Sequence, residues 1–378
     1  MSAGTPVWEG GGWSGLPALE ADTEADVCVV GLGGSGLASV AELLRLGARV
    51  VGIDGGLVAG GAAGRNGGFL LAGSYDFYHD AVSRHGRARA LRIHRLTEEE
   101  IARIAAETPD AVRRTGSLRI AGSAEEEADC RDQLAAMHAD GLAAEWYEGA
   151  EGRGLLFPAD GAFDPLLRCR TLALRAVDAG ARLFEGTPAL EVAPGAVRTA
   201  RGTVRCGAVV VAVDGRLERI LPELEGRVRT ARLQMLATAP APEVRFPRPV
   251  YARYGMEYWQ QLPDGRVALG GFRDRGGEAE WTAGAVPAEP VQGALERFLR
   301  GRLGVRAPVT HRWAAPVGFT PTGLPVLEEV RRDVWAAGGY CGTGNAIGAL
   351  CGRAAAGLAL GRGSDAAEVF GSTGDVQA

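Results

Sequence analysis

The sequence contains no lysine, and all 41 of its basic residues are arginines. A Schiff-base or catalytic lysine is therefore excluded. Six cysteines are scattered without a Cys-x-x-Cys pair, and the five histidines include no His-x-x-x-His spacing. These patterns exclude a disulfide framework, and we expect no metal site.

Long apolar runs are also lacking, since none approaches the roughly 20 residues that a membrane helix requires. The N-terminal stretch MSAGTPVWEGGGWSG has neither the basic start nor the apolar core of a signal peptide. The formal net charge of −5 gives no electrostatic reason to expect nucleic acid or an anionic membrane surface as a partner. We expect a cytoplasmic protein with small-molecule ligands, no nucleic-acid partner and no membrane span.

What the chain does contain is the pattern of an α/β protein, and its 378 residues suffice for about two domains. Strand–loop–helix patterns occur at the start, middle and end, with helical and alternating stretches between them. We predict a discontinuous nucleotide-binding domain interleaved with an antiparallel-sheet domain. The expected boundaries are an arm over 1–24, a nucleotide-binding domain over 25–86, 150–225 and 319–378, and a substrate domain over 87–149 and 226–318.

The first glycine-rich loop follows a buried strand and opens a helix. Its sequence, Gly31-Leu-Gly33-Gly34-Ser35-Gly36, fits the GxGxxG pattern, and Asp54 ends the next strand. Glycines there permit a tight turn, close approach to a pyrophosphate, and close packing of helix on strand, while the helix N-terminus favours the anion. We predict a dinucleotide site in which Asp54 accepts a hydrogen bond from a ribose.

A second glycine-rich loop, GGYCGTGNAIG (338–348), also follows a buried strand and precedes a helix. One dinucleotide needs only one pyrophosphate loop, so this second loop requires another role. The third informative stretch is GGAAGRNGGFL (60–70), which comes after the second strand.

With these stretches the chain resembles the D-amino-acid-oxidase-like (DAO) family of flavoproteins, in particular its gamma-glutamylputrescine oxidase and glycine oxidase branches. The resemblance extends over almost the whole chain. Its further segments are TGSLRIAG (115–122), FDPLLRCRTLALRAVDAGA (163–181), AVVVAVDG (208–215) and RWAAPVGFTPTGLPV (312–326).

This resemblance implies an interleaved FAD-binding fold of the glutathione-reductase type and FAD in extended form. The pyrophosphate would lie on the first loop, the flavin on residues 64–68, and the N1–C2=O edge of the flavin on the second loop. The implied cofactor-binding residues are Gly31, Gly33, Gly34, Ser35, Gly36, Asp54, Gly64, Arg65, Asn66, Gly67, Gly68, Ala189, Gly215, Gly342, Thr343, Gly344 and Asn345. Ala315 stands where sarcosine-oxidase-like members carry a tethering cysteine, so we predict non-covalent FAD.

The activity implied by the resemblance is oxidation of a C–N bond. A hydride leaves the carbon next to an amine nitrogen for flavin N5, the imine is hydrolysed, and oxygen or another acceptor takes the electrons. Val317 replaces the arginine that grips a substrate carboxylate in related enzymes, and Thr322 replaces an aspartate in the following turn. We therefore expect an amine without a carboxylate at the reacting carbon, or one anchored elsewhere.

Pocket candidates come from the antiparallel region and from the segments around the late loops. They are Arg253, Tyr254, Tyr258, Trp259, Arg273, Trp313 and Cys341. Other interpretations remain open: an FAD-linked 2-hydroxy-acid dehydrogenase, a flavin-binding protein without amine oxidase activity, and an NAD-dependent dehydrogenase.

Overall fold

The computed structural model describes residues 2–371. They form two compact units, each assembled from three separate stretches of chain. Of these residues, unit 1 comprises 2–10, Arg65–Asp164 and Ala231–Pro316, and unit 2 comprises Gly11–Gly64, Pro165–Thr230 and 317–371.

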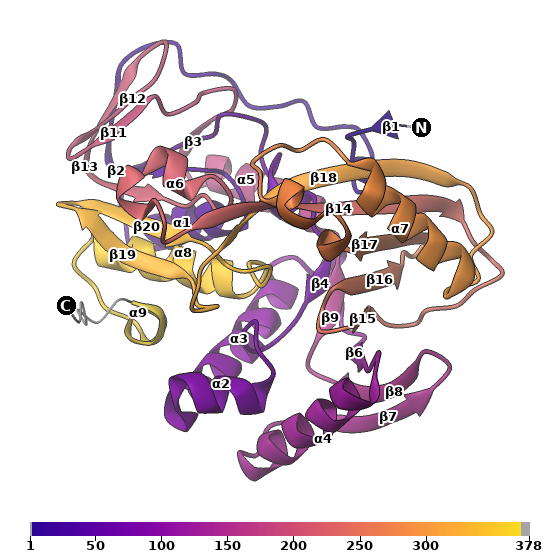
Figure 1. Cartoon of the computed structure of the whole chain (residues 1–378). Coiled ribbons are helices and arrows are strands. Elements are labelled where there is room, and N and C mark those ends of the chain that lie inside the picture. Colours follow the sequence, from indigo (N-terminus) through magenta and orange to yellow (C-terminus); the bar gives the residue numbers. More distant parts are fainter. Residues whose placement is uncertain (1, 372–378) are drawn as a thin grey trace. The chain divides into compact units, whose positions relative to one another are not determined.

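Unit 2 is built on a sheet whose central strands are parallel (Figure 1). The strands run in the order β10-β3-β2-β13-β20, with β19 antiparallel to β20 and the hairpin β11–β12 attached to β13. Helices α1 and α8 pack against each other and against the sheet. The elements are β2 (Thr23–Val30), α1 (Gly34–Arg45), β3 (Val50–Ile53), η1 (Ala62–Gly64), α5 (Pro165–Asp178), β10 (Arg182–Phe184), β11 (Glu191–Ala193), β12 (Ala196–Arg198), β13 (Thr203–Val211), α6 (Leu217–Ile220), η3 (Pro222–Leu224), β19 (Val326–Arg331), β20 (Val334–Gly338), α8 (Ile347–Ala359) and α9 (Asp365–Phe370).

The parallel strands are continuous apolar runs because both faces of this sheet are covered. Val27 and Cys28 are consecutive in β2 and point to opposite faces, yet both are fully buried. Residues of β2, β13 and β20 share one apolar cluster. The burial fixes the register of the strands, and this places the loops after β2, β3, β13 and β20 at one edge of the sheet.

Unit 1 contains a nine-stranded sheet, in the order β1-β18-β14-β17-β16-β15-β6-β8-β7, and a three-stranded sheet β4-β9-β5. Strands β14, β17, β16 and β15 form the antiparallel region. The elements are β1 (Ser2–Ala3), β4 (Phe69–Leu70), α2 (Tyr78–His85), α3 (Arg87–Glu107), η2 (Pro109–Ala111), β5 (Val112–Arg113), β6 (Ser117–Ile120), α4 (Ala124–Ala139), β7 (Glu145–Gly149), β8 (Gly152–Phe157), β9 (Gly161–Phe163), β14 (Arg229–Pro240), β15 (Val250–Ala252), β16 (Glu257–Gln261), β17 (Arg266–Gly271), η4 (Arg273–Arg275), η5 (Gly277–Glu280), α7 (Glu289–Gly301) and β18 (Val309–Phe319).

The two faces of the nine-stranded sheet differ in character. One face carries a row of apolar residues that are paired from strand to strand and pack with α7, namely Leu118, Val250, Trp259 and Leu269. Because side chains alternate along a strand, the residues that flank these in each strand face the other side. That second row consists of Arg119, Tyr251, Tyr258 and Gly270.

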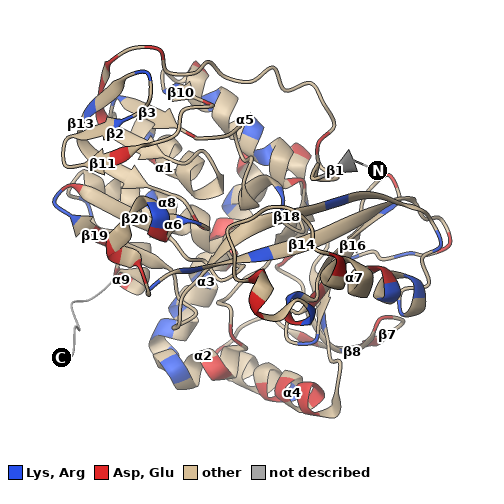
Figure 2. Cartoon of the chain, turned by 45° about the horizontal axis from the view of Figure 1, so that its top comes forward, with Lys and Arg blue, Asp and Glu red and all other residues tan. Residues whose placement is uncertain are grey.

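Helices α2, α3 and α4 pack on the face of the sheet that carries the second row. Leu155, which pairs with Arg119, packs into a cluster with residues of these helices. Helix α4 begins at an ordinary N-cap, because the Ser123 hydroxyl accepts the N–H of Glu126 at 3.2 Å. Acidic side chains gather along α4, whereas α7 carries charges of both signs (Figure 2).

The boundaries of the two units differ from those expected from the sequence. Residues 65–86 and 150–164 were expected in the nucleotide-binding domain but cluster with unit 1. The physical reason is strand pairing, since β4 pairs with β9 and β8 pairs with β6. Within residues 2–371, no helix has the length and apolarity to cross a membrane, and no group of His, Cys, Asp or Glu side chains could hold a metal ion.

Candidate functional site: two glycine loops and a glycine strip

The first loop of unit 2 is closed by steric contact at its glycines. A Cβ added at Gly36 would lie 1.8 Å from the carbonyl oxygen of Gly31. Gly31 has φ +102°, and a Cβ there would lie 2.6 Å from the Ala212 carbonyl oxygen. Neither position accepts a side chain, so both glycines are required for α1 to leave β2 at this angle.

The same loop presents backbone donors at the start of α1. The N-cap residue Gly33 has no side chain to cap the helix. Among the described residues, the N–H groups of Gly34, Ser35 and Gly36 donate no backbone hydrogen bond. Helix N-termini of this kind bind phosphate, because the donors and the helix dipole both favour an anion.

Arg168 on α5 adds a positive charge to this loop, which the sequence did not reveal. Its side chain is 2% exposed, and its Nη1 lies 3.9 Å from the Cβ position of Gly34. A buried guanidinium beside unbonded N–H groups strengthens the case for an anionic ligand.

Asp54 follows β3 and holds the first loop in place. Its Oδ2 accepts the N–H of Leu32 at 2.8 Å, and its Oδ1 accepts the N–H of Gly56 at 2.8 Å. Burial raises the pKa of Asp54, and the two backbone hydrogen bonds oppose that rise. Each oxygen retains a second lone pair, so a ribose hydroxyl remains a possible further donor.

The second loop of unit 2 is held in a similar way by Asp214, which follows β13. Its Oδ1 accepts the N–H of Tyr340 at 2.9 Å, and its Oδ2 accepts the N–H of Gly318 at 3.2 Å. Burial raises the pKa of Asp214 to about 6, and the backbone hydrogen bonds oppose this. Asp214 was not among the predicted site residues, although the neighbouring Gly215 was.

The two loops differ in which backbone N–H groups are available to a ligand. In the second loop the N–H and the hydroxyl of Thr343 both donate to the carbonyl of Tyr340, at 2.9 and 2.7 Å. The first N–H of α8, that of Ile347, donates to Thr343. No acceptor among the described residues takes the N–H groups of Gly342 and Gly344, so these are the backbone donors left for a ligand.

Cys341 lies inside this second loop with φ +52°, which is unusual for a residue with a side chain. It is 3% exposed, and its Sγ accepts the N–H of Thr320 at 3.3 Å. These contacts give Cys341 a structural task in fixing the loop. Val317 and Ala315 are also buried, at 7% and 4% exposure.

Two further residues of unit 2 that were predicted to bind the cofactor are buried or partly buried. Ala189 is partly buried and packs against the cluster of the parallel sheet, and Gly215 is buried directly after Asp214. Gly64 ends η1, and a Cβ there would lie 2.4 Å from the carbonyl oxygen of Ala59.

In unit 1 the residues Gly67 and Gly68 form a strip against the second row of the large sheet. A Cβ at Gly67 would lie 3.2 Å from the Tyr258 ring, and one at Gly68 would lie 2.4 Å from the Phe163 carbonyl oxygen. The Gln260 amide donates to the carbonyls of Gly67 and Gly68 at 2.5 and 3.1 Å. Side chains are therefore excluded from this glycine strip, and its carbonyls are fixed.

Two indole rings hold the residues that directly precede the strip. Trp8 donates its Nε1 hydrogen to the carbonyl of Asn66 at 2.9 Å, and Trp313 donates to the carbonyl of Arg65 at 2.7 Å. Trp313 is completely buried. The Asn66 side chain in turn accepts the N–H of Gly68 at 2.8 Å.

Of the other predicted pocket residues, only Tyr258 lies on the glycine strip. Trp259 faces the opposite side of the sheet and belongs to the apolar core with α7. Tyr254 is 46% exposed and donates to Asp129, and Arg253 forms ion pairs with Glu257 and Asp274.

Arg273 lies over the Trp281 ring at 4.6 Å. Among the predicted pocket residues of unit 1, Tyr258 contacts the strip and Trp313 bonds to Arg65 beside it. Tyr254, Trp259 and Arg253 have other partners. Gln260 and Trp8 were not predicted as site residues, because their contacts join residues far apart in the sequence.

Similarity to known proteins extends over most of the chain. Residues 26–358 match the model of the family described as DAO, FAD dependent oxidoreductase. The chain is 28% identical to a probable oxidoreductase OrdL of Rhizobium meliloti, over 93% of this chain and 86% of the relative. It is 27% identical to the gamma-glutamylputrescine oxidoreductase of Escherichia coli, over 91% of this chain and 85% of the relative.

Solved structures show the same fold. Glycine oxidase from Geobacillus kaustophilus superposes with a TM-score of 0.75 at 21% identity, over 90% of this chain and 96% of that one. The L-proline dehydrogenase of P. horikoshii gives a TM-score of 0.73 at 19% identity, over 90% and 94%. The predicted fold class is confirmed, and the chain belongs to the DAO family of FAD-dependent oxidoreductases.

Proposed function

We propose that the protein oxidises the C–N bond of an amine whose reacting carbon bears no carboxylate. When bound, FAD supplies the acceptor for the hydride that leaves this carbon. The product imine is then hydrolysed by water to a carbonyl compound and the released amine or ammonia. Electrons pass on to oxygen or to another acceptor.

The residues present fit FAD. The pyrophosphate would meet the N–H groups of Gly34, Ser35 and Gly36, and the ribose would meet Asp54. The glycine strip would present bare backbone to a flat ring, because a side chain at Gly67 or Gly68 would meet Tyr258 or the Phe163 carbonyl oxygen and is therefore excluded. FAD is the cofactor of this family, and we propose that it is bound without a covalent link, since Ala315 stands at the tethering position.

The single observation that carries the amine assignment is the sheet face over the glycine strip. Tyr258 and Gln260 present a phenol ring and an amide there. Hydride transfer from a carbon next to a neutral amine needs no strong protein base, but it needs a shaped wall that orients the C–H bond. The named relatives support this, since one is a gamma-glutamylputrescine oxidoreductase and another a glycine oxidase.

The absence of an α-carboxylate is inferred from position 317. Related enzymes place an arginine there, whereas here Val317 is 7% exposed and apolar. A buried valine cannot pair with a carboxylate, and an unpaired buried carboxylate is strongly disfavoured. Alkylamines should therefore react better than glycine, sarcosine or D-amino acids.

The test is anaerobic reduction of the purified holoenzyme by a panel of primary and secondary amines, amino acids and 2-hydroxy acids. We expect the visible flavin absorbance to bleach with amines that lack an α-carboxylate. Preferential bleaching by glycine, sarcosine or D-amino acids would contradict the amine assignment, and bleaching by 2-hydroxy acids would favour a hydroxy-acid dehydrogenase. Flavin left in the pellet after acid precipitation would show a covalent link.

The acceptor is tested by mixing the reduced enzyme with oxygen in a stopped-flow instrument. Rapid return of the oxidised absorbance would identify an oxidase. Slow return, together with rapid return on addition of a quinone, would identify a dehydrogenase.

A further inference from the structure

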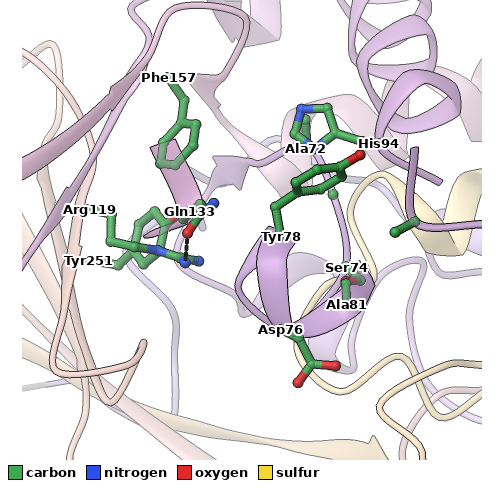
Figure 3. Close-up of a pocket in the computed structure, with 12 residues that line it drawn as sticks. Ala72, Ser74, Asp76, Tyr78, Ala81, His94, Arg119, Gln133, Phe157 and Tyr251 are labelled. Carbon is green, nitrogen blue, oxygen red and sulfur yellow. Dashed lines mark hydrogen bonds between the residues drawn. The ribbon is translucent and has the colours of Figure 1, made fainter. Parts of the chain in front are cut away.

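Two groups of polar contacts lie beside the second row of the large sheet in unit 1. One surrounds a small cavity of about 20 Å³, where the Arg119 guanidinium donates to the Gln133 amide oxygen at 2.5 Å (Figure 3). Among the described residues, those that line this cavity include neither glycine of the strip. The other group surrounds the glycine strip itself, and residues 2–10, which we call the N-terminal segment, take part in it.

The N-terminal segment is held to unit 1 at several points. Its first strand, β1, pairs in parallel with β18. The Gly4 carbonyl accepts a hydrogen bond from Arg65 at 2.6 Å, and the Val7 carbonyl accepts one from Arg266 at 3.3 Å. These contacts fix the course of the backbone up to Trp8.

Trp8 is the residue of this segment that reaches the strip. It is 9% exposed, and its Nε1 hydrogen is donated to the Asn66 carbonyl at 2.9 Å. Its ring also fills the space beside Gly68, because a Cβ there would lie 2.9 Å from the ring atom Cη2. An indole has one donor and no acceptor, so this single hydrogen bond uses its full capacity. Trp8 thus fixes the position of the Asn66 carbonyl oxygen.

The peptide unit between Asn66 and Gly67 is held at its carbonyl end only. This peptide is trans, so it is planar and its C=O and N–H groups point in opposite directions. Because Trp8 holds the carbonyl, it also sets the direction of the Gly67 N–H, which points away from the indole. Among the described residues, this N–H donates no hydrogen bond, and Gly67 is partly exposed.

The next peptide unit, between Gly67 and Gly68, is held at both ends. Its carbonyl accepts a hydrogen bond from the Gln260 amide at 2.5 Å, and its N–H donates to Oδ1 of Asn66 at 2.8 Å. The Gln260 amide is itself oriented, since its Oε1 accepts a hydrogen bond from Arg113 at 2.8 Å. The Gly67 N–H is therefore a donor that the strip leaves for a ligand.

We infer that Trp8 is a positioning residue of the flavin site: by holding the Asn66 carbonyl, it aims the Gly67 N–H at an acceptor atom of the flavin ring. The inference rests on the place proposed above for the flavin, at the glycine strip, and does not depend on which substrate is oxidised. The N-terminal segment is then a working part of the site.

A donor whose direction is fixed has a consequence for reduction of the flavin. Negative charge on the ring acceptors of a flavin grows when it is reduced, and an N–H group that is already in place stabilises this charge without reorganisation. A peptide that can rotate loses part of this effect. Without the hydrogen bond from Trp8, the flavin should therefore be harder to reduce.

The test compares the holoenzyme with Trp8→Phe, which keeps an aromatic ring but removes the donor. We expect the affinity for reduced FAD relative to oxidised FAD to fall about tenfold, which lowers the two-electron midpoint potential by about 30 mV. A reductive titration against a reference dye measures this potential and uses no amine. Trp8→His restores a ring N–H, so it should recover part of the shift.

The matched control is Trp13→Phe. The Trp13 indole donates to the Glu185 carboxylate at 3.0 Å in unit 2, so the same substitution removes the same type of donor from another partner. Trp13→Phe should keep the midpoint potential of the unchanged protein. A lower unfolding temperature for Trp8→Phe with an unchanged potential would show that Trp8 supports the fold alone, and would overturn the proposal. Equal shifts of the potential in both variants would also overturn it.

A second measurement applies if Trp8→Phe loses its flavin. ADP carries the pyrophosphate of FAD without the flavin, and calorimetry measures its binding to the apoprotein. Weaker binding of FAD, with ADP affinity within twofold of the unchanged protein, supports a role at the flavin. Equal losses of FAD and ADP affinity identify a general effect on the fold and overturn the proposal. Because neither measurement uses an amine, failure of the proposed amine oxidation leaves the result for Trp8 intact.

Discussion

The two glycine-rich loops of unit 2 look alike in sequence but are built differently. Each follows a parallel strand, precedes a helix, and is tied to the sheet by a carboxylate, Asp54 in the first and Asp214 in the second. The first loop is closed by backbone contacts that only glycine tolerates. In the second, a Cβ at Gly338 would lie 2.3 Å from the Val213 carbonyl oxygen, but a Cβ at Gly342, in the middle of the loop, would meet nothing within 4 Å. Steric contact therefore closes the first loop at both of its ends, whereas in the second it acts where the loop leaves β20, and hydrogen bonds hold the middle of the loop.

The largest expected effect comes from Gly36→Ala. The new Cβ would lie 1.8 Å from the Gly31 carbonyl oxygen, so α1 must shift away from β2. We expect the purified protein to lose its flavin and to unfold at a much lower temperature, as overpacking typically costs about 1–3 kcal/mol and sometimes more. The ratio of visible flavin absorbance to protein absorbance, with a thermal unfolding scan, measures both.

The matched control for this variant is Gly61→Ala. Gly61 belongs to the same unit, and a Cβ there meets nothing within 4 Å. This control should keep its flavin and its unfolding temperature. A yellow and stable Gly36→Ala protein would show that the first loop is not closed by steric contact.

The next effect concerns Asp214 and depends on pH. Burial raises the pKa of Asp214 from its ordinary 3.8 to about 6 in the folded protein. The folded state therefore holds this proton more tightly, and stability falls as the pH rises from about 4 to about 6. The loss is up to about 3 kcal/mol, because one pKa unit corresponds to about 1.4 kcal/mol.

Asp214→Asn should remove this dependence. The difference in unfolding free energy, unchanged protein minus variant, is expected to fall between about pH 4 and pH 6 and then to stay level. Denaturant titrations over this range measure it. Burial also raises the pKa of Asp160 to about 6. Asp160 is present in both proteins, so its contribution cancels in the difference. If the difference stays level over the whole pH range, Asp214 does not have a raised pKa in the folded protein.

The contrast between the two loops shows what the sequence can predict. The role of Gly31 and Gly36 was predictable, because strand, glycines and helix are neighbours in the chain and each glycine acts locally. The tie between Asp214 and Tyr340 was not, since these residues are 126 positions apart and no local pattern marks the contact.

The same distinction holds in unit 1. The family resemblance implied a flavin contact at residues 64–68, and the alternation around residue 258 predicted strands. Which side of β16 faces the strip was not predictable, so Tyr258 and Trp259 were both proposed as pocket walls. The sheet register separates them, because Trp259 pairs with the apolar residues Val250 and Leu269.

A smaller effect is expected for Gly342→Ala in the second loop. Here the space is open, so the cost comes only from φ +89°, a region that disfavours residues with a Cβ by about 1–2 kcal/mol. We expect the flavin to be retained and the unfolding free energy to fall by that amount. Loss of flavin comparable to that of Gly36→Ala would mean that both loops are equally closed.

The smallest effect is expected for Thr343→Val, and it tests what the second loop does for the cofactor. The Thr343 hydroxyl donates to the Tyr340 carbonyl, which also accepts the Thr343 N–H. Loss of one of two hydrogen bonds to the same oxygen should lower the unfolding free energy by about 0.5–1.5 kcal/mol. If the hydroxyl is only structural, the dissociation constant of FAD, measured by titrating apoprotein, stays within about twofold. A rise beyond tenfold would instead show that Thr343 reaches the cofactor directly, because a tenfold change corresponds to about 1.4 kcal/mol in binding alone. The second loop would then act through its side chains, whereas the first acts through its backbone.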